Sequence, residues 1–119
     1  MRDLRRYKFN GQECGKGRIV LEVVRKYVEQ HPEAGFEELK RTFPDDLQKT
    51  GAAAQFSTDG QCVIKRRKDV TDEKRFHMNK KDQIELMGEQ VVVSREWNIN
   101  NIQNFITKAY DLGFEIEML

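Results

Sequence analysis

The feature that most constrains the fold is an apolar stripe in the first third of the chain. Its residues recur with the 3.6-residue period of an α-helix: Ile19, Val20, Val23, Val24, Tyr27 and Val28. On the polar side, Glu22 and Lys26 stand at i,i+4 in the favourable order. Pro32 ends the pattern, because the residue before a proline avoids the helical region. The sequence therefore predicts an amphipathic helix from about Gly17 to Gln30.

A second, shorter helix follows. Phe36, Leu39 and Phe43 fall at i, i+3 and i+7, so they share one helical face. Pro44 is expected to end this helix. Residues 45–60 are less regular, and their second half, residues 51–60, is interpreted as a plastic connector.

A third helix is expected from Asn98 to Leu112. Four apolar residues form its buried stripe: Ile102, Phe105, Ile106 and Ala109. Either Asn98 or Asn100 can cap its start, and Gly113 supplies the left-handed residue that follows its end. Trp97, at the end of the preceding strand, is expected to join this helix in the core.

Alternation of polar and apolar residues predicts several strands. Arg6–Asn10 alternates polar and aromatic residues and is expected to form a short edge strand. Met87-Gly88-Glu89 is typical of a tight hairpin turn. Val91–Val93 is apolar on both faces and is therefore expected to be a central strand. The other segments with a period of two lie around residues 62–64, 76–78, 84–86 and 114–118.

Together these elements predict an α+β domain. The expected layout is an N-terminal helix pair, then a mostly antiparallel sheet of about four to five strands with a C-terminal helix packed on it. The 119 residues have the length of a single domain, residues 1–119. No apolar run approaches the roughly 18 residues of a transmembrane helix, and no apolar signal region begins the chain. We therefore expect no membrane partner and a cytoplasmic location.

The cysteines and histidines do not indicate a metal site. Cys14 and Cys62 are expected to be free thiols in a cytoplasmic chain. With His31 and His77 they come from four unrelated segments, without the CxxC or HxxxH spacing that preorganises zinc ligands. We expect no metal and no cofactor.

One segment resembles a phosphate-binding loop. Gly11–Arg18 lies between an expected strand and an expected helix, but its spacing is one residue short. Gly17 stands where the Ser or Thr that binds magnesium is required. A glycine-rich turn without a ligand is the simpler interpretation. In a looser alternative, N–H groups at the helix start, beside Lys16 and Arg18, hold a phosphate without hydrolysing it.

A second pattern formally matches a nuclease. Asp45 and the motif Asp72-Glu73-Lys74 would have to share a metal ion, with Lys74 at the activated water. The second motif is expected in a loop, whereas the active form needs a strand anchored in the core. No catalytic residue is therefore assigned.

The order of the charges is more informative than the net charge of +1. Residues 1–30 carry eight cationic and four anionic side chains, and residues 61–81 carry eight and three. Residues 31–60 and 82–119 are net acidic. If the two basic blocks meet in space, they form a face that attracts phosphate backbones. The alternative is that Lys65–Lys68 is a solvated hairpin end.

Five segments share a pattern with one known family. They are Tyr7–Glu13 with Gly15–Arg18, Phe36–Leu39 with Phe43-Pro44, Val91–Asn98, Asn101–Ile106 and Leu112–Ile116. In this pattern the chain resembles a small bacterial domain family of unassigned activity, whose members occur alone or beside restriction-type endonuclease modules. The resemblance implies no catalytic signature, and it implies DNA as a partner by analogy only.

The function predicted from the sequence is that of a non-enzymatic accessory or interaction domain. It would bind nucleic acid weakly, without sequence preference, in restriction or defence systems. Six residues are assigned to phosphate contact: Lys16, Arg18, Lys65, Arg66, Arg67 and Lys68. The alternative is a protein–protein interaction module with no nucleic-acid role, which exposes the strand edge at Phe114–Met118. A small metal-dependent nuclease is the third hypothesis.

Overall fold

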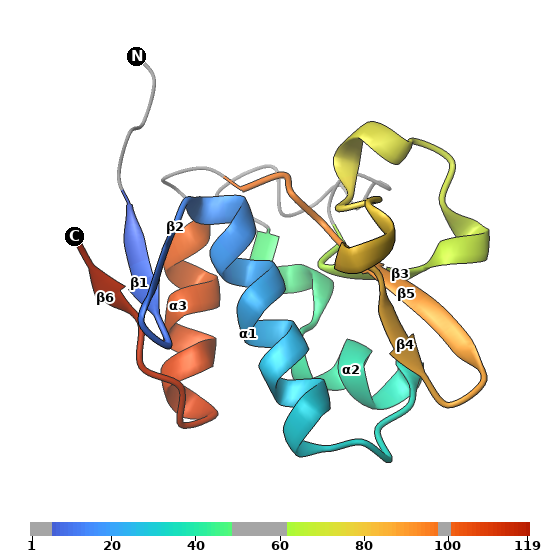
Figure 1. Ribbon diagram of the computed structural model, residues 1–119, viewed down its shortest axis with the longest axis horizontal. Coiled ribbons are helices and arrows are strands. Elements are labelled where there is room, and N and C mark those ends of the chain that lie inside the picture. Colours follow the sequence, from blue (N-terminus) through green and yellow to red (C-terminus); the bar gives the residue numbers. More distant parts are fainter. Residues whose placement is uncertain (1–5, 49–61, 98–100) are drawn as a thin grey trace.

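The computed structural model of the protein describes residues 6–48, 62–97 and 101–119. Helix α1, Lys16–Gln30, lies in the middle of the fold, with a small sheet on either side and helix α3 next to it (Figure 1). Its apolar stripe is buried at Ile19, Val20, Leu21, Val23, Val24 and Tyr27. The predicted helix is therefore confirmed to within one residue at its start.

The first sheet consists of three short antiparallel strands in the order β2-β1-β6. They are β1 (Tyr7–Phe9), β2 (Gln12–Cys14) and β6 (Glu117–Met118). Asn10 and Gly11, with φ of 56° and 81°, form the turn between β1 and β2. Positive φ at both positions is the type I′ geometry that Asn-Gly favours. The expectation of an edge strand at Arg6–Asn10 is thus wrong, because this turn folds β2 back onto β1 and makes β1 the central strand.

The second sheet is also antiparallel, in the order β3-β5-β4. Its strands are β3 (Ile64–Arg66), β4 (Ile84–Leu86) and β5 (Glu89–Val93). Val91 and Val93 belong to the main core, whereas Val92 packs in a separate small cluster with Cys62 and Phe76. The prediction of a central strand at 91–93 is confirmed. The turn predicted at Met87-Gly88-Glu89 is confirmed for Met87-Gly88, whereas Glu89 already begins β5.

Two more helices complete the core. Helix α2 covers Phe36–Thr42 and α3 covers Ile102–Asp111. The Phe105 ring of α3 lies 5.8 Å from the Phe43 ring and 5.4 Å from the Trp97 ring, measured between centroids. Trp97 is buried as expected, and its Nε1–H donates to the Ser94 carbonyl at 3.1 Å.

The α+β class is confirmed, but the predicted layout is only partly right. Two three-stranded sheets replace the single sheet of four to five strands, and the β1–β2 hairpin precedes the helix pair. The strand expected at residues 76–78 is reduced to one bridge between Phe76 and Ser94, because 3-10 turns flank it. Only Glu117–Met118 of the expected last strand pairs. The connector at 51–60 and the caps Asn98 and Asn100 lie outside the described residues.

Replacing Phe105 by Ala should lower the free energy of unfolding by about 3–5 kcal/mol. Phe105 is fully buried between two aromatic rings, so the truncation leaves a cavity. Urea titration followed by Trp97 fluorescence measures the change. Gln103→Ala, at an exposed position of the same helix, should stay within about 0.5 kcal/mol of the wild type. A loss below about 1 kcal/mol for Phe105→Ala contradicts the packing of this ring between Phe43 and Trp97.

Candidate nucleic-acid interface

The segment between β3 and β4 forms a lobe on the outer face of the second sheet. It contains three 3-10 turns, Arg67–Asp69, Glu73–Arg75 and Lys80–Asp82, coloured yellow-green to gold in Figure 1. Phe76 of this segment packs with Cys62 and with Val92 of β5, and Val70 and Met78 pack against this cluster. We call residues 67–82 the cationic lobe, because they carry six cationic and four anionic side chains.

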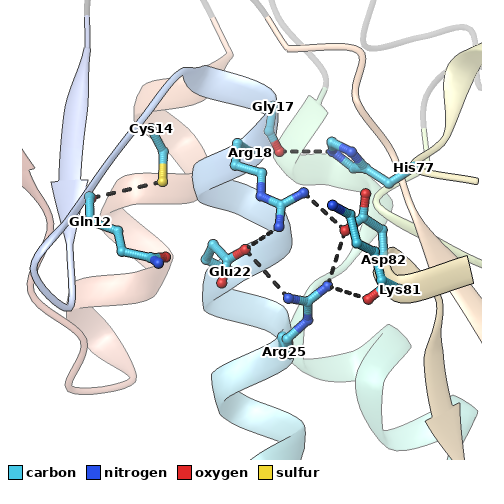
Figure 2. A network of polar contacts seen from close by, with 9 residues as sticks. All are labelled: Gln12, Cys14, Gly17, Arg18, Glu22, Arg25, His77, Lys81 and Asp82. Carbon is cyan, nitrogen blue, oxygen red and sulfur yellow. Dashed lines mark hydrogen bonds and ion pairs between the residues drawn. The ribbon is translucent and has the colours of Figure 1, made fainter. Parts of the chain in front are cut away.

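Helix α1 neutralises the one buried acid of the cationic lobe. Asp82 is only 5% exposed, and its Oδ1 accepts hydrogen bonds from Arg18 at 2.9 Å and from Arg25 at 3.3 Å. Figure 2 shows both guanidinium groups turned toward this carboxylate, with Glu22 bridging them from the other side. Arg25 also donates to the Lys81 carbonyl at 3.0 Å. These contacts tie the lobe to α1.

The environment of Asp82 favours its charged form. Burial by itself raises the pKa of this carboxyl group, but the hydrogen bonds and charges of Arg18 and Arg25 outweigh burial and lower it below its usual value. The carboxylate is therefore ionised throughout the neutral range. Its negative charge is neutralised by the guanidinium groups of Arg18 and Arg25.

His77 makes a second connection between the cationic lobe and α1. Its Nε2 lies 3.0 Å from the Gly17 carbonyl oxygen (Figure 2). A carbonyl oxygen only accepts hydrogen bonds, so Nε2 carries the proton in this contact. Burial, the strongest influence, lowers the pKa of His77, and Arg95 and Arg18 act in the same direction. The ring is therefore neutral at pH 7.

The start of α1 is closely packed rather than open. A Cβ on Gly17 would lie 3.4 Å from the Arg95 carbonyl oxygen and 3.6 Å from its Cα. Gln12–Cys14, which precedes the helix, is a strand and not a loop. The segment Gly11–Arg18 thus departs from a phosphate-binding loop in conformation as well as in spacing.

Among the described residues, more of the lobe's cations than of its acids lack an ion pair. Asp72 pairs with Arg75 at 3.0 Å, and Asp82 pairs with α1, which leaves Asp69 and Glu73 as the other acids. Within the described part of the chain, six cations in or beside the lobe form no ion pair: Arg67, Lys68, Lys74, Lys80, Lys81 and Arg95. All of these are exposed except Arg67, which is half-buried. The lobe therefore presents excess positive charge to solvent.

Four of the six residues assigned from the sequence line two different cavities. Arg18 lines a cavity of about 580 Å³ together with His77 and Arg95, whereas Arg66, Arg67 and Lys68 line another of about 420 Å³ at the β4–β5 turn. Lys16 begins α1, and Lys65 lies in β3 opposite Val92.

Arg66 is committed to structural contacts. Its Nε donates to Glu89 at 2.7 Å, and its guanidinium carbon lies 4.2 Å above the centre of the Phe36 ring. Glu37 lies 3.6 Å from the same group. Because these contacts join α2, β3 and β5, we expect Arg66 to hold the sheet against α2. Of the run 65–68, Arg67 and Lys68 present charge without an internal ion pair.

Sequence reasoning left four exposed cations unassigned: Lys74, Lys80, Lys81 and Arg95. The first three belong to the basic block at 61–81, so the block's charge was the available signal. Arg95 lies in the acidic block at 82–119, where the order of the charges gives no sign of a cationic site. It reaches the lobe because its backbone N–H donates to the Arg75 carbonyl at 2.9 Å.

The residues of the nuclease pattern are occupied in other ways. Asp45 forms an ion pair with Lys40, and Asp72 caps a 3-10 turn by accepting from the Lys74 backbone N–H at 3.2 Å. Within residues 6–48, 62–97 and 101–119, no three His, Cys, Asp or Glu side chains are grouped so that they could hold a metal ion. In the part of the chain that the structure describes, Cys14 and Cys62 are buried and form no disulfide.

Comparisons with known proteins place no further constraint on the site. No protein-family model, curated protein or solved structure matches this chain. The resemblance to a small bacterial domain family remains a prediction. Among the helices of the described ranges, none has the length and apolar character needed to cross a bilayer.

Replacing Asp82 by Asn should lower the free energy of unfolding at pH 7 by about 1–3 kcal/mol, because two charge-assisted hydrogen bonds are weakened. The lowered pKa of Asp82 means that its stabilisation is complete above the unfolded value near 3.9 and is lost as pH falls through the folded value. Urea titrations at pH 7 and pH 3 should therefore show a smaller difference at pH 3. Asp111→Asn, at an exposed site, serves as the control. Equal losses at both pH values contradict the prediction.

Replacing His77 by Gln should remove part of the protein's acid sensitivity. Because the folded pKa of His77 is lowered, its neutral form supports stability above the unfolded value near 6.5, and that support declines as pH falls below it. The wild type should lose at most about 1.4 kcal/mol per pH unit from this one proton. Thermal or urea unfolding between pH 7 and 5 measures the slope. His31→Gln, whose ring packs on Tyr27, is the matched single-histidine control.

Proposed function

We propose that the protein is a non-enzymatic domain that binds the phosphate backbone of duplex DNA through its cationic lobe. The observation that carries this proposal is the unequal pairing of charge on residues 67–82. Two of their four acids, Asp72 and Asp82, are drawn into ion pairs with Arg75 and with α1, while Arg67, Lys68, Lys74, Lys80 and Lys81 keep their charge exposed or half-exposed.

The chemistry follows from the charge alone. Cations near a duplex displace condensed counterions, which favours binding at low salt and gives no preference for sequence. Asp69 and Glu73 reduce the field of the lobe without cancelling it. We expect a dissociation constant of about 10⁻⁴ to 10⁻⁶ M, the usual range for non-specific contacts. The resemblance to domains found beside restriction-type modules supports a setting in restriction or defence.

The variant Lys68→Ala/Lys74→Ala/Lys80→Ala should weaken DNA binding and flatten its salt dependence. The log–log slope of affinity against salt should lose about 2 to 3 units, since each phosphate contact contributes about 0.9. The three side chains are exposed, so the fold should be retained. Fluorescence anisotropy of a labelled duplex, at several salt concentrations, measures the slope.

The matched control is Lys8→Ala/Arg41→Ala/Lys108→Ala. It removes the same number of positive charges from β1, α2 and α3, none of which belongs to the lobe. Its slope should change by less than about 1 unit. Equal effects of the two variants would show that only net charge matters. No binding at about 50 mM salt would contradict the proposal and favour the protein-binding alternative.

A further inference from the structure

The tip of the β4–β5 hairpin carries an exposed apolar side chain beside the cationic lobe. Met87 is 74% exposed, the most of any large hydrophobic residue in the described ranges. The others that are exposed, Tyr110, Met118 and Leu119, lie in or near α3 and β6. Tyr110 is engaged there, since its hydroxyl donates to the Ile116 carbonyl. Among the described residues, Met87 is therefore the one large exposed apolar residue that lies beside the cationic lobe.

The turn itself does not explain the methionine. Leu86 pairs with Glu89, so Met87 and Gly88 form a two-residue loop. Gly88, with φ of 83°, supplies the left-handed residue, whereas φ of Met87 is not positive. The turn needs no particular side chain at position 87, in contrast to Asn10, whose φ of 56° favours an asparagine. The side chain of Met87 is thus free to serve a contact.

The surroundings of Met87 indicate what it would contact. Arg67, Lys68, Met87 and Gln90 line the cavity of about 420 Å³ at the hairpin tip. The one acid there, Glu89, is paired with Arg66 at 2.7 Å. The patch therefore combines an adaptable apolar side chain with two unpaired cations, which complements a duplex with phosphates outside and stacked bases inside.

Building on the proposed function, we propose that Met87 is an apolar wedge that enters the minor groove of duplex DNA. It partly unstacks one base step there, while Arg67 and Lys68 contact the phosphates on either side. Such a wedge bends the duplex and widens the surface that the protein covers. The site is thus assigned to duplex DNA, with flexible pyrimidine–purine steps as the favoured places of insertion.

The test compares Met87→Ala with Met118→Ala, which removes an exposed methionine from β6. Met87→Ala should weaken binding to a duplex of about 20 base pairs by about three- to tenfold, since part of the gain from burial is offset by unstacking. The salt slope should stay unchanged, because methionine carries no charge. Energy transfer between dyes at the duplex ends should show bending by the wild type and by Met118→Ala, but not by Met87→Ala.

The outcomes separate this inference from the proposed function. If the wild type binds no duplex at about 50 mM salt, both fail. If it binds with a normal salt slope but Met87→Ala behaves like Met118→Ala, the wedge is overturned and the cationic interface stands. A duplex RNA of equal length serves as a further arm, because its minor groove is wide and shallow. An equal effect of Met87→Ala on RNA would overturn the assignment to the DNA groove.

Discussion

One buried carboxylate controls the surface on which the function of this protein is proposed. Asp82 accepts hydrogen bonds from Arg18 and Arg25, and through them it fixes the cationic lobe to α1. The same contacts cancel the acid's charge within the protein. The lobe's lysines are then left without an equal number of acids facing solvent, so a chain with a net charge of +1 acquires a local cationic face. The contacts of Asp82 with Arg18 and Arg25 therefore both hold the lobe on α1 and leave the lobe with excess positive charge.

The position of α1 makes this arrangement possible. Each sheet has only three strands of two to five residues, and such small sheets need a packed face to be stable. Helix α1 contacts both sheets and α3, with its apolar stripe in the main core (Figure 1). Its polar side, with Arg18, Glu22 and Arg25, is therefore held facing the lobe (Figure 2). The backbone of Arg95 lies beside Gly17 in the first turn of α1.

Local patterns explain which parts of the structure could be predicted. The helices α1, α2 and α3 follow from apolar residues repeated at helical spacing, and β5 follows from three valines that have a packed surface on each face. The β1–β2 hairpin was missed, although Asn10-Gly11 is a strong hairpin signal. The sequence favours a glycine-rich turn at Gly11–Arg18, yet residues 12–14 of this segment form strand β2. The division into two sheets had no local signal, because strand partners are chosen by packing.

The sequence by itself determined the α+β class, the three helices, the central strand and the basic character of residues 61–81. These properties depend on residues close together in the chain, so composition and spacing express them directly. Only the tertiary structure decided which charges stay exposed. Arg18 and Asp82 are 64 residues apart, and Arg66 and Glu89 are 23 apart, so no local pattern reveals that they pair. Charge pairing depends on distance in space, and the folding of α1 against the lobe sets that distance.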